Sequence, residues 1–197
     1  SLLETAYQET LGRAGDEGGL EFYQNAIDAG VTTVDEVRRQ LAGTDEASDF
    51  LSNSYQNTLG RAGDEGGLEF YQNAIASGQM SQDEIRQLMA RSDESTNFLS
   101  DNFQSVYDRD LGETGQTYYQ NALASGEINQ NQIRQALAQS TEGQNLLESA
   151  YQNQLGRDSD ASGLAYYTGT LGGNRSIAEI RQEINESSEG RQYRDSQ

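Results

Sequence analysis

The chain has 197 residues, and 32 acidic against 13 basic residues give it a formal net charge of -19. All basic residues are Arg, and the absence of His and Cys excludes zinc sites, thiol nucleophiles and imidazole bases. A charge of this sign repels phosphate, which disfavours nucleic acid and anionic membrane surfaces as partners.

A repeated segment organises the chain. The sequence LGRAGDEGGLEFYQNAI occupies residues 11–27 and returns unchanged at residues 59–75, and weaker copies run from 107 to 123 and from 155 to 171. The spacing is about 48 residues, a period that is typical of stacked supersecondary units. Because only 34% of the residues are hydrophobic, several small cores fit better than one large core.

Each repeat is predicted to form three helices, and the second repeat shows the pattern best. Its first helix is expected over about residues 45–58. Thr44 precedes this segment as a helix-capping residue, with two acidic residues in the first turn, where the helix dipole favours negative charge. Gly60 follows it, as Gly commonly does at a helix C-terminus.

The second and third helices of the repeat are predicted from the same signals. The second helix begins after Asp64 and stops at Gly78, and the third begins after Ser81. Ile85, Leu88 and Met89 are expected to form the buried side of the third helix.

The predicted fold is therefore all-α, a tandem array of four three-helix modules. No segment alternates with a period of two, so we expect no sheet. No apolar run approaches the roughly 20 residues that a helix needs to span a bilayer, so we expect no membrane insertion. The expected modules are residues 1–43, with a partly truncated first helix, then 44–91, 92–139 and 140–186, and residues 187–197 start a further helix.

Polar residues recur at the expected helix starts, and we interpret them as structural caps. They are Asp16, Asp64 and Asp160 before the second helices, and Thr44, Ser92, Ser140 and Ser187 before the first helices.

An arginine precedes the acidic turn of every module, at Arg13, Arg61, Arg109 and Arg157. We expect each guanidinium to bind the carboxylate of its own turn or the carbonyls at the end of the first helix. An exposed arginine row that binds a ligand is the alternative, and the surrounding negative charge disfavours it.

The turn of module four resembles the opening of a calcium-binding loop. Asp158, Asp160 and Ser162 place oxygen atoms at alternate positions, and Gly163 follows. The pattern then fails, because the bidentate Glu of such loops is replaced by Gly169. Capping is the favoured interpretation, with calcium as the alternative and no other cofactor expected.

Pairs of adjacent aromatic residues recur in the second helices. One member of each pair lies on the apolar stripe, and the other is a candidate contact residue for a protein or carbohydrate partner. These contact candidates are Phe22, Phe70, Tyr118 and Tyr166.

No catalytic residue is predicted. Acidic residues are abundant, but none forms a distinct pair with one member in an apolar setting, as acid–base catalysis requires. The acidic pairs at helix starts are explained by the helix dipole. We therefore do not expect an enzyme.

The motif L-G-R-x-x-D-x-x-G-L-x-Y/F-Y resembles the bacterial domain-of-unknown-function family 4214, which looks distantly similar to phycobilisome linker domains. Module two carries it as Leu59, Gly60, Arg61, Asp64, Gly67, Leu68, Phe70 and Tyr71, with Ser92 and Glu94 downstream. Modules one and four carry it well, and module three only in part. The resemblance implies small helical modules, often in tandem, in secreted, surface or phage-associated proteins, and it implies no activity.

The combined interpretation is a non-enzymatic structural or interaction protein of an extracellular, cell-surface or virion assembly. We expect protein partners, through self-association or assembly in a larger particle. Two alternatives stay open, namely phycobilisome-linker-like scaffolding between protein subunits and a calcium-stabilised adhesion module.

Overall fold

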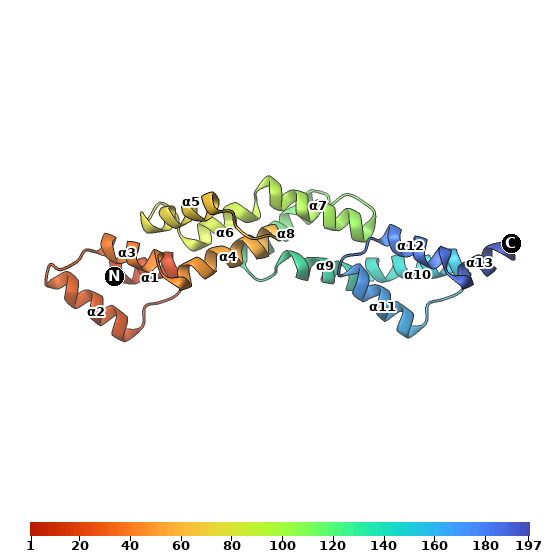
Figure 1. Ribbon diagram of the computed structural model, residues 1–197, viewed down its shortest axis with the longest axis horizontal. Helices are drawn as coiled ribbons and strands as arrows, with labels where there is room; N and C mark the ends of the chain where they lie inside the picture. Colours follow the sequence, from red (N-terminus) through yellow and green to blue (C-terminus); the bar gives the residue numbers. More distant parts are fainter. The chain divides into compact units, whose positions relative to one another are not determined.

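The computed structural model describes all residues, 1–197, and it contains thirteen α-helices and no strand (Figure 1). The all-α class and the repeated helical modules are confirmed. The helices are α1 (Leu2–Leu11), α2 (Glu17–Asp28), α3 (Val34–Ala42), α4 (Asp45–Leu59), α5 (Glu65–Ala76), α6 (Gln82–Ala90), α7 (Asp93–Tyr107), α8 (Glu113–Ser125), α9 (Gln130–Gln139), α10 (Thr141–Leu155), α11 (Ala161–Leu171), α12 (Ile177–Glu186) and α13 (Ser188–Asp195).

The chain divides into two compact units, which are described separately. The first comprises Ser1–Ser95 and Gln120–Glu127, and it holds modules one and two with the end of α8. The second comprises Thr96–Tyr119 and Ile128–Gln197, and it holds most of module three together with module four and α13.

The helix boundaries follow from local chemistry. The Thr44 hydroxyl accepts the Ala47 N–H at 3.3 Å and caps α4. Gly60 ends that helix with φ 68°, in the left-handed region that Gly enters without a steric cost. The α5 helix ends one residue earlier than the sequence predicts, with Ser77 as its C-cap, and Gly78 follows with φ 74°.

The core of module two shows which face of each helix is buried. Leu51 of α4, Ile75 of α5, and Ile85 and Met89 of α6 are 0 to 3% exposed and pack in one cluster. Leu88 is 47% exposed, so the prediction that it is buried was wrong. The buried face of α6 also includes Gln82 and Ala90, so it is centred near Met89, and Leu88 lies beyond its edge on the side of Ile85.

Modules stack through their third and second helices. In the first unit α3 packs on α5, and in the second unit α9 packs on α11. Ala42 at the end of α3 belongs to the core cluster of module two. The α5 and α11 helices therefore lie between the first helix of their own module and the third helix of the preceding one. The α2 helix contacts α1, and none of its residues is buried.

Candidate functional site

An ion pair joins each turn to the start of the next module. Arg61 Nε donates to Glu94 Oε1 at 2.5 Å, and Arg61 Nη2 donates to Glu94 Oε2 at 3.0 Å. The same guanidinium also donates to the Ala62 carbonyl at 2.9 Å. Three further pairs have the same bidentate geometry, with N–O distances of 2.5 to 3.0 Å: Arg13–Glu46, Arg109–Glu142 and Arg157–Glu189.

Each of these guanidinium groups also lies over an aromatic ring of the first helix. The Arg61 Cζ is 5.2 Å from the centroid of the Tyr55 ring. The other pairs are Arg13 over Tyr7 at 5.8 Å, Arg157 over Tyr151 at 5.3 Å, and Arg109 over Phe103 at 5.4 Å and Tyr107 at 5.0 Å. A cation over a ring face adds a favourable electrostatic contact to the ion pair. We call the Arg, its Glu and the ring beneath it the arginine clasp.

Within the clasp, the Arg and the Glu each stabilise the charged form of the other. The hydrogen bond from Arg61 lowers the pKa of Glu94, and the hydrogen bond to Glu94 raises the pKa of Arg61. The side chains of both residues are more than 40% exposed, so solvent screens the pair and each clasp contributes at most about 1 kcal/mol. The clasp holds the turn and the next helix in register more than it adds stability.

The sequence predicts the carboxylate of the turn, or the carbonyls at the end of the first helix, as the arginine partner, and in the structure the turn carboxylate is only a more distant partner. Asp64 lies 3.6 Å from Arg61, and Asp160 lies 3.7 Å from Arg157. The short hydrogen bonds go instead to a Glu that lies 32 or 33 residues further along the chain. Sequence spacing alone does not bring these two positions together, because the intervening second and third helices do so.

The turn aspartates cap the second helices. Asp16, Asp64 and Asp160 accept the backbone N–H of the residue three positions later at 2.8, 3.0 and 2.8 Å. The backbone N–H of Gly67 lowers the pKa of Asp64. At the first helices, the hydroxyl groups of four residues accept the equivalent N–H at 3.1 to 3.3 Å, namely Thr44, Ser92, Ser140 and Ser187.

A packed tyrosine explains the Gly in the first turn of the second helix. A Cβ atom on Gly67 would collide with the Tyr55 hydroxyl oxygen, and one on Gly163 would collide with that of Tyr151. Module three has Phe103 at this position, which has no hydroxyl, and a Cβ on Gly115 would lie 3.8 Å from its ring. The motif Gly therefore provides the space for the Tyr side chain beneath the clasp.

In the calcium-like turn of module four, the carboxylate oxygens accept hydrogen bonds from groups of the protein. Asp158 Oδ1 accepts from Gln152 at 3.1 Å, and Asp160 Oδ1 accepts from Ser162 Oγ at 2.9 Å and from Gly163 N at 2.8 Å. No three His, Cys, Asp or Glu side chains of the chain form a cluster that could hold a metal ion. The observed arrangement is that of a helix-capping turn.

A second arginine series was missed by the sequence analysis. Arg134 Nε donates to the Leu171 carbonyl at 3.1 Å, and Arg134 Nη2 donates to the Arg175 carbonyl at 2.8 Å, beyond the end of α11. Burial lowers the pKa of Arg134. In module two, Arg86 donates to the Ser125 carbonyl at the end of α8 at 3.3 Å. The signal was present in the sequence as an Arg after a buried Val or Ile in every third helix: Arg38, Arg86, Arg134 and Arg181.

The candidate contact aromatics lie on the surface. Phe22, Phe70, Tyr118 and Tyr166 are 68, 62, 67 and 56% exposed. Each ring makes an edge-on contact with the ring of the next residue, at centroid distances of 5.0 to 5.3 Å. That next residue is always a half-buried Tyr. Each module thus presents one exposed aromatic ring on its second helix, beside a half-buried Tyr.

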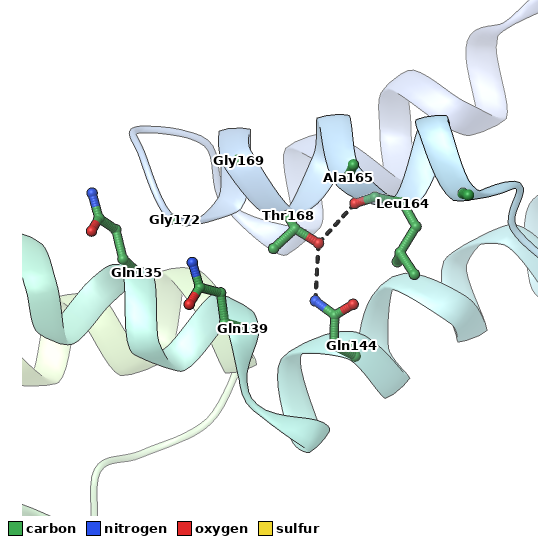
Figure 2. Close-up of a pocket in the computed structure, with 9 residues that line it drawn as sticks. Gln135, Gln139, Gln144, Leu164, Ala165, Thr168, Gly169 and Gly172 are labelled. Atoms are coloured by element: carbon green, nitrogen blue, oxygen red, sulfur yellow. Dashed lines mark hydrogen bonds between the residues drawn. The ribbon is translucent and has the colours of Figure 1, made fainter.

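A groove of the second unit has a mixed lining of apolar and uncharged polar residues. It measures about 690 Å³ and lies between α9 and α11 (Figure 2). Gln144 Nε2 donates to Thr168 Oγ1 at 2.9 Å, and the Thr168 hydroxyl donates to the Leu164 carbonyl at 2.7 Å. Gln135 and Gln139 from α9 complete one wall. These groups can form hydrogen bonds, but none is an acid, a base or a nucleophile at neutral pH.

Comparisons with known proteins agree with the repeat architecture. No helix has the length and apolar character that crossing a membrane requires. No curated protein matches the chain. One family model matches it twice, over residues 36–98 and 94–147, which together cover more than half of the chain. The chain belongs to the family described as Domain of unknown function (DUF4214).

Proposed function

We propose that this protein is a non-enzymatic structural and interaction repeat protein of an extracellular, cell-surface or virion assembly. The observation that carries the proposal is the set of exposed aromatic rings, one on the second helix of every module. Exposed aromatic side chains on a well-packed support are typical anchors of protein interfaces.

The charge of the protein favours basic partner surfaces. A net charge of -19 attracts cationic partners and resists nonspecific association with other acidic proteins. Four such rings on one chain also allow multivalency, because several weak contacts bind a repetitive partner much more tightly than one contact does when they engage it together. A protein lattice is the proposed repetitive partner, and a polysaccharide is the alternative.

A variant that lacks all four exposed rings tests the proposal. The substitutions Phe22→Ala, Phe70→Ala, Tyr118→Ala and Tyr166→Ala should leave the melting temperature nearly unchanged, because the rings are exposed. They should also release the protein from the surface, secreted or particle fraction of its native cells. A control variant with Glu21→Ala and Glu69→Ala should stay in that fraction.

Two results would contradict the proposal. One is recovery of the native protein only as a free intracellular monomer. The other is retention of the four-fold aromatic variant in the assembled fraction at the level of the unmodified protein.

A further inference from the structure

The arginine of the third helix meets a different partner in different modules. In module one, Arg38 Nη1 donates to Glu9 Oε2 of α1 at 2.5 Å, across 29 residues of sequence. In module three, Arg134 Nη2 donates to Ser105 Oγ at 2.9 Å, again 29 residues earlier in the chain. In both modules the guanidinium therefore finds an oxygen acceptor at the same position of the first helix.

Module two has no carboxylate at that position. The residue 29 positions before Arg86 is Asn57, which lies one repeat period after Glu9. Arg86 Nη1 donates to the Ser125 carbonyl at 3.3 Å and to Asp83 Oδ1, in its own helix, at 3.4 Å. The Asp83 side chain is 68% exposed, and no group of the chain accepts a hydrogen bond from Nε or Nη2 of Arg86. Two nitrogens of this guanidinium are therefore free to bind an acceptor from outside.

A pocket of about 250 Å³ lies beside this guanidinium, between α4, α6 and the end of α8, and all of its lining belongs to the first unit. The Arg86 Cζ is 5.3 Å from the centroid of the Phe50 ring, which forms part of the wall. Asn53 and Asn57 of α4 also line the pocket, and neither side-chain amide has a hydrogen-bond partner in the chain. The pocket is smaller than the roughly 300–1,000 Å³ of drug-sized ligand sites, so it suits one small polar group.

The lining favours a carboxylate that has hydroxyl groups beside it. A guanidinium presents paired N–H donors that match the two oxygens of a carboxylate, and Glu9 of module one is an internal example of an acid in contact with this arginine. Amide groups both donate and accept hydrogen bonds, as hydroxyl groups do, so Asn53 and Asn57 match hydroxyl groups. A doubly charged phosphate fits less well, because one Arg is set against a net charge of -19.

We infer that this pocket binds a sugar acid of the uronic-acid class, with its carboxylate on Arg86 and its hydroxyl groups on Asn53 and Asn57. The carboxylate of the ligand takes the place that the Glu9 side chain has in module one. The inference goes beyond the proposed function, because none of the four exposed aromatic rings lines this pocket.

NMR titration of the full chain with sodium galacturonate tests the inference through the side-chain N–H signals of Arg86, Asn53 and Asn57. We expect saturable shifts with a Kd on the order of 1 mM, because a few hydrogen bonds reinforce one partly exposed ion pair. Galactose, which lacks the carboxylate, and NaCl at matched ionic strength should cause no saturable shift.

The same chemistry occurs in a free sugar acid and in an acidic polysaccharide. A parallel titration with the galacturonate trimer separates these two sources. Tighter binding of the trimer than of the monomer identifies the polysaccharide as the source, and equal or weaker binding identifies the free acid.

The variant Asn57→Glu places the carboxylate of module one in the pocket of module two. It should weaken galacturonate binding at least tenfold, because the new carboxylate pairs with Arg86 and repels the ligand. The melting temperature should not fall, since module one already contains the equivalent pair. The matched control Gln56→Glu adds the same charge on the next residue, outside the pocket lining, and should leave binding nearly unchanged.

Three outcomes would overturn the inference: the absence of saturable shifts with galacturonate, equal shifts with galactose or NaCl, or binding that Asn57→Glu leaves intact. None of these outcomes bears on the exposed aromatic rings, which the fractionation experiment tests separately.

Discussion

Module one and module two contain the same second helix in two environments. Residues 17–27 and 65–75 are identical, yet Ile75 is 1% exposed while Ile27 is only half-buried. The difference is the preceding module, whose α3 packs against α5 and whose α1 also contacts it. In a repeat protein, stability is divided between the modules and the junctions, and this pair of helices separates the two contributions.

The largest expected effect is a difference between two identical substitutions. Ile75→Ala should lower the free energy of unfolding by about 3 kcal/mol, because it leaves a cavity under α3. Ile27→Ala should cost about 1 kcal/mol, because solvent already reaches part of that side chain. Urea unfolding of both variants measures the difference, and equal costs would break the comparison between the modules.

A smaller contrast is expected for the glutamine on the same helix face. Gln72→Ala removes the hydrogen bond to the Ala42 carbonyl and should cost about 1 kcal/mol. Gln24→Ala removes only an exposed contact with Asp28 and should change the free energy of unfolding by less than about 0.5 kcal/mol. If Gln24→Ala were the more damaging of the two, the account of the α3–α5 junction would fail.

The arginine clasp is what the two modules share, so its effects should be equal. Arg13→Ala and Arg61→Ala should each cost about 0.5 kcal/mol, because both pairs are partly exposed. A clear difference between the two variants would show that the clasp depends on the position of its module in the array.

The clasp also predicts a pH dependence with a definite sign. The pKa of Glu94 is lower in the folded chain than its ordinary value of 4.5, so its contribution is present above that value and is lost as the pH falls through the folded-state pKa. A double-mutant cycle of Arg61→Ala and Glu94→Gln should therefore show coupling at pH 7 and none at strongly acidic pH. Coupling that persists in acid would argue against the ion pair.

The smallest effect is expected from calcium. Asp158 accepts a hydrogen bond from Gln152 of α10, Asp160 accepts one from the Gly163 backbone N–H, and no three acidic side chains form a cluster that could hold a metal ion. Adding millimolar Ca²⁺ should shift the melting temperature by no more than a matched ionic strength of NaCl does. A rise of many degrees that is specific to Ca²⁺ and abolished by Asp158→Asn would establish the calcium alternative.

Local chemistry allowed much of the fold to be predicted from sequence. Helix starts follow from residues such as Thr44 and Asp64, whose side-chain oxygens cap nearby backbone N–H groups, and the end of α4 follows from Gly60. The period of the repeat allowed the modules to be predicted, because most copies carry equivalent caps and every copy carries an apolar stripe.

The contacts between helices could not be predicted in the same way. The Glu partner of Arg61 lies 33 residues away, and its place depends on how two helices pack between them. The exposure of Leu88 follows from a buried face of α6 that also includes Gln82 and Ala90 and is centred away from Leu88, which a simple apolar pattern does not resolve. The low burial of α2 could not be predicted for a stronger reason, because residues 17–27 have the same sequence as residues 65–75 of α5, which contains buried residues.

Hydrogen exchange of the backbone amides in α2 and α5 tests the central claim most directly, with NMR or with proteolytic fragments that extend past Asp28 and Ala76 to tell the copies apart. If burial comes from the junction, the amides around Ile75 should exchange much more slowly than those around Ile27. Equal protection of the two identical segments would contradict the account, because it would mean that each module holds its second helix without help from its neighbour.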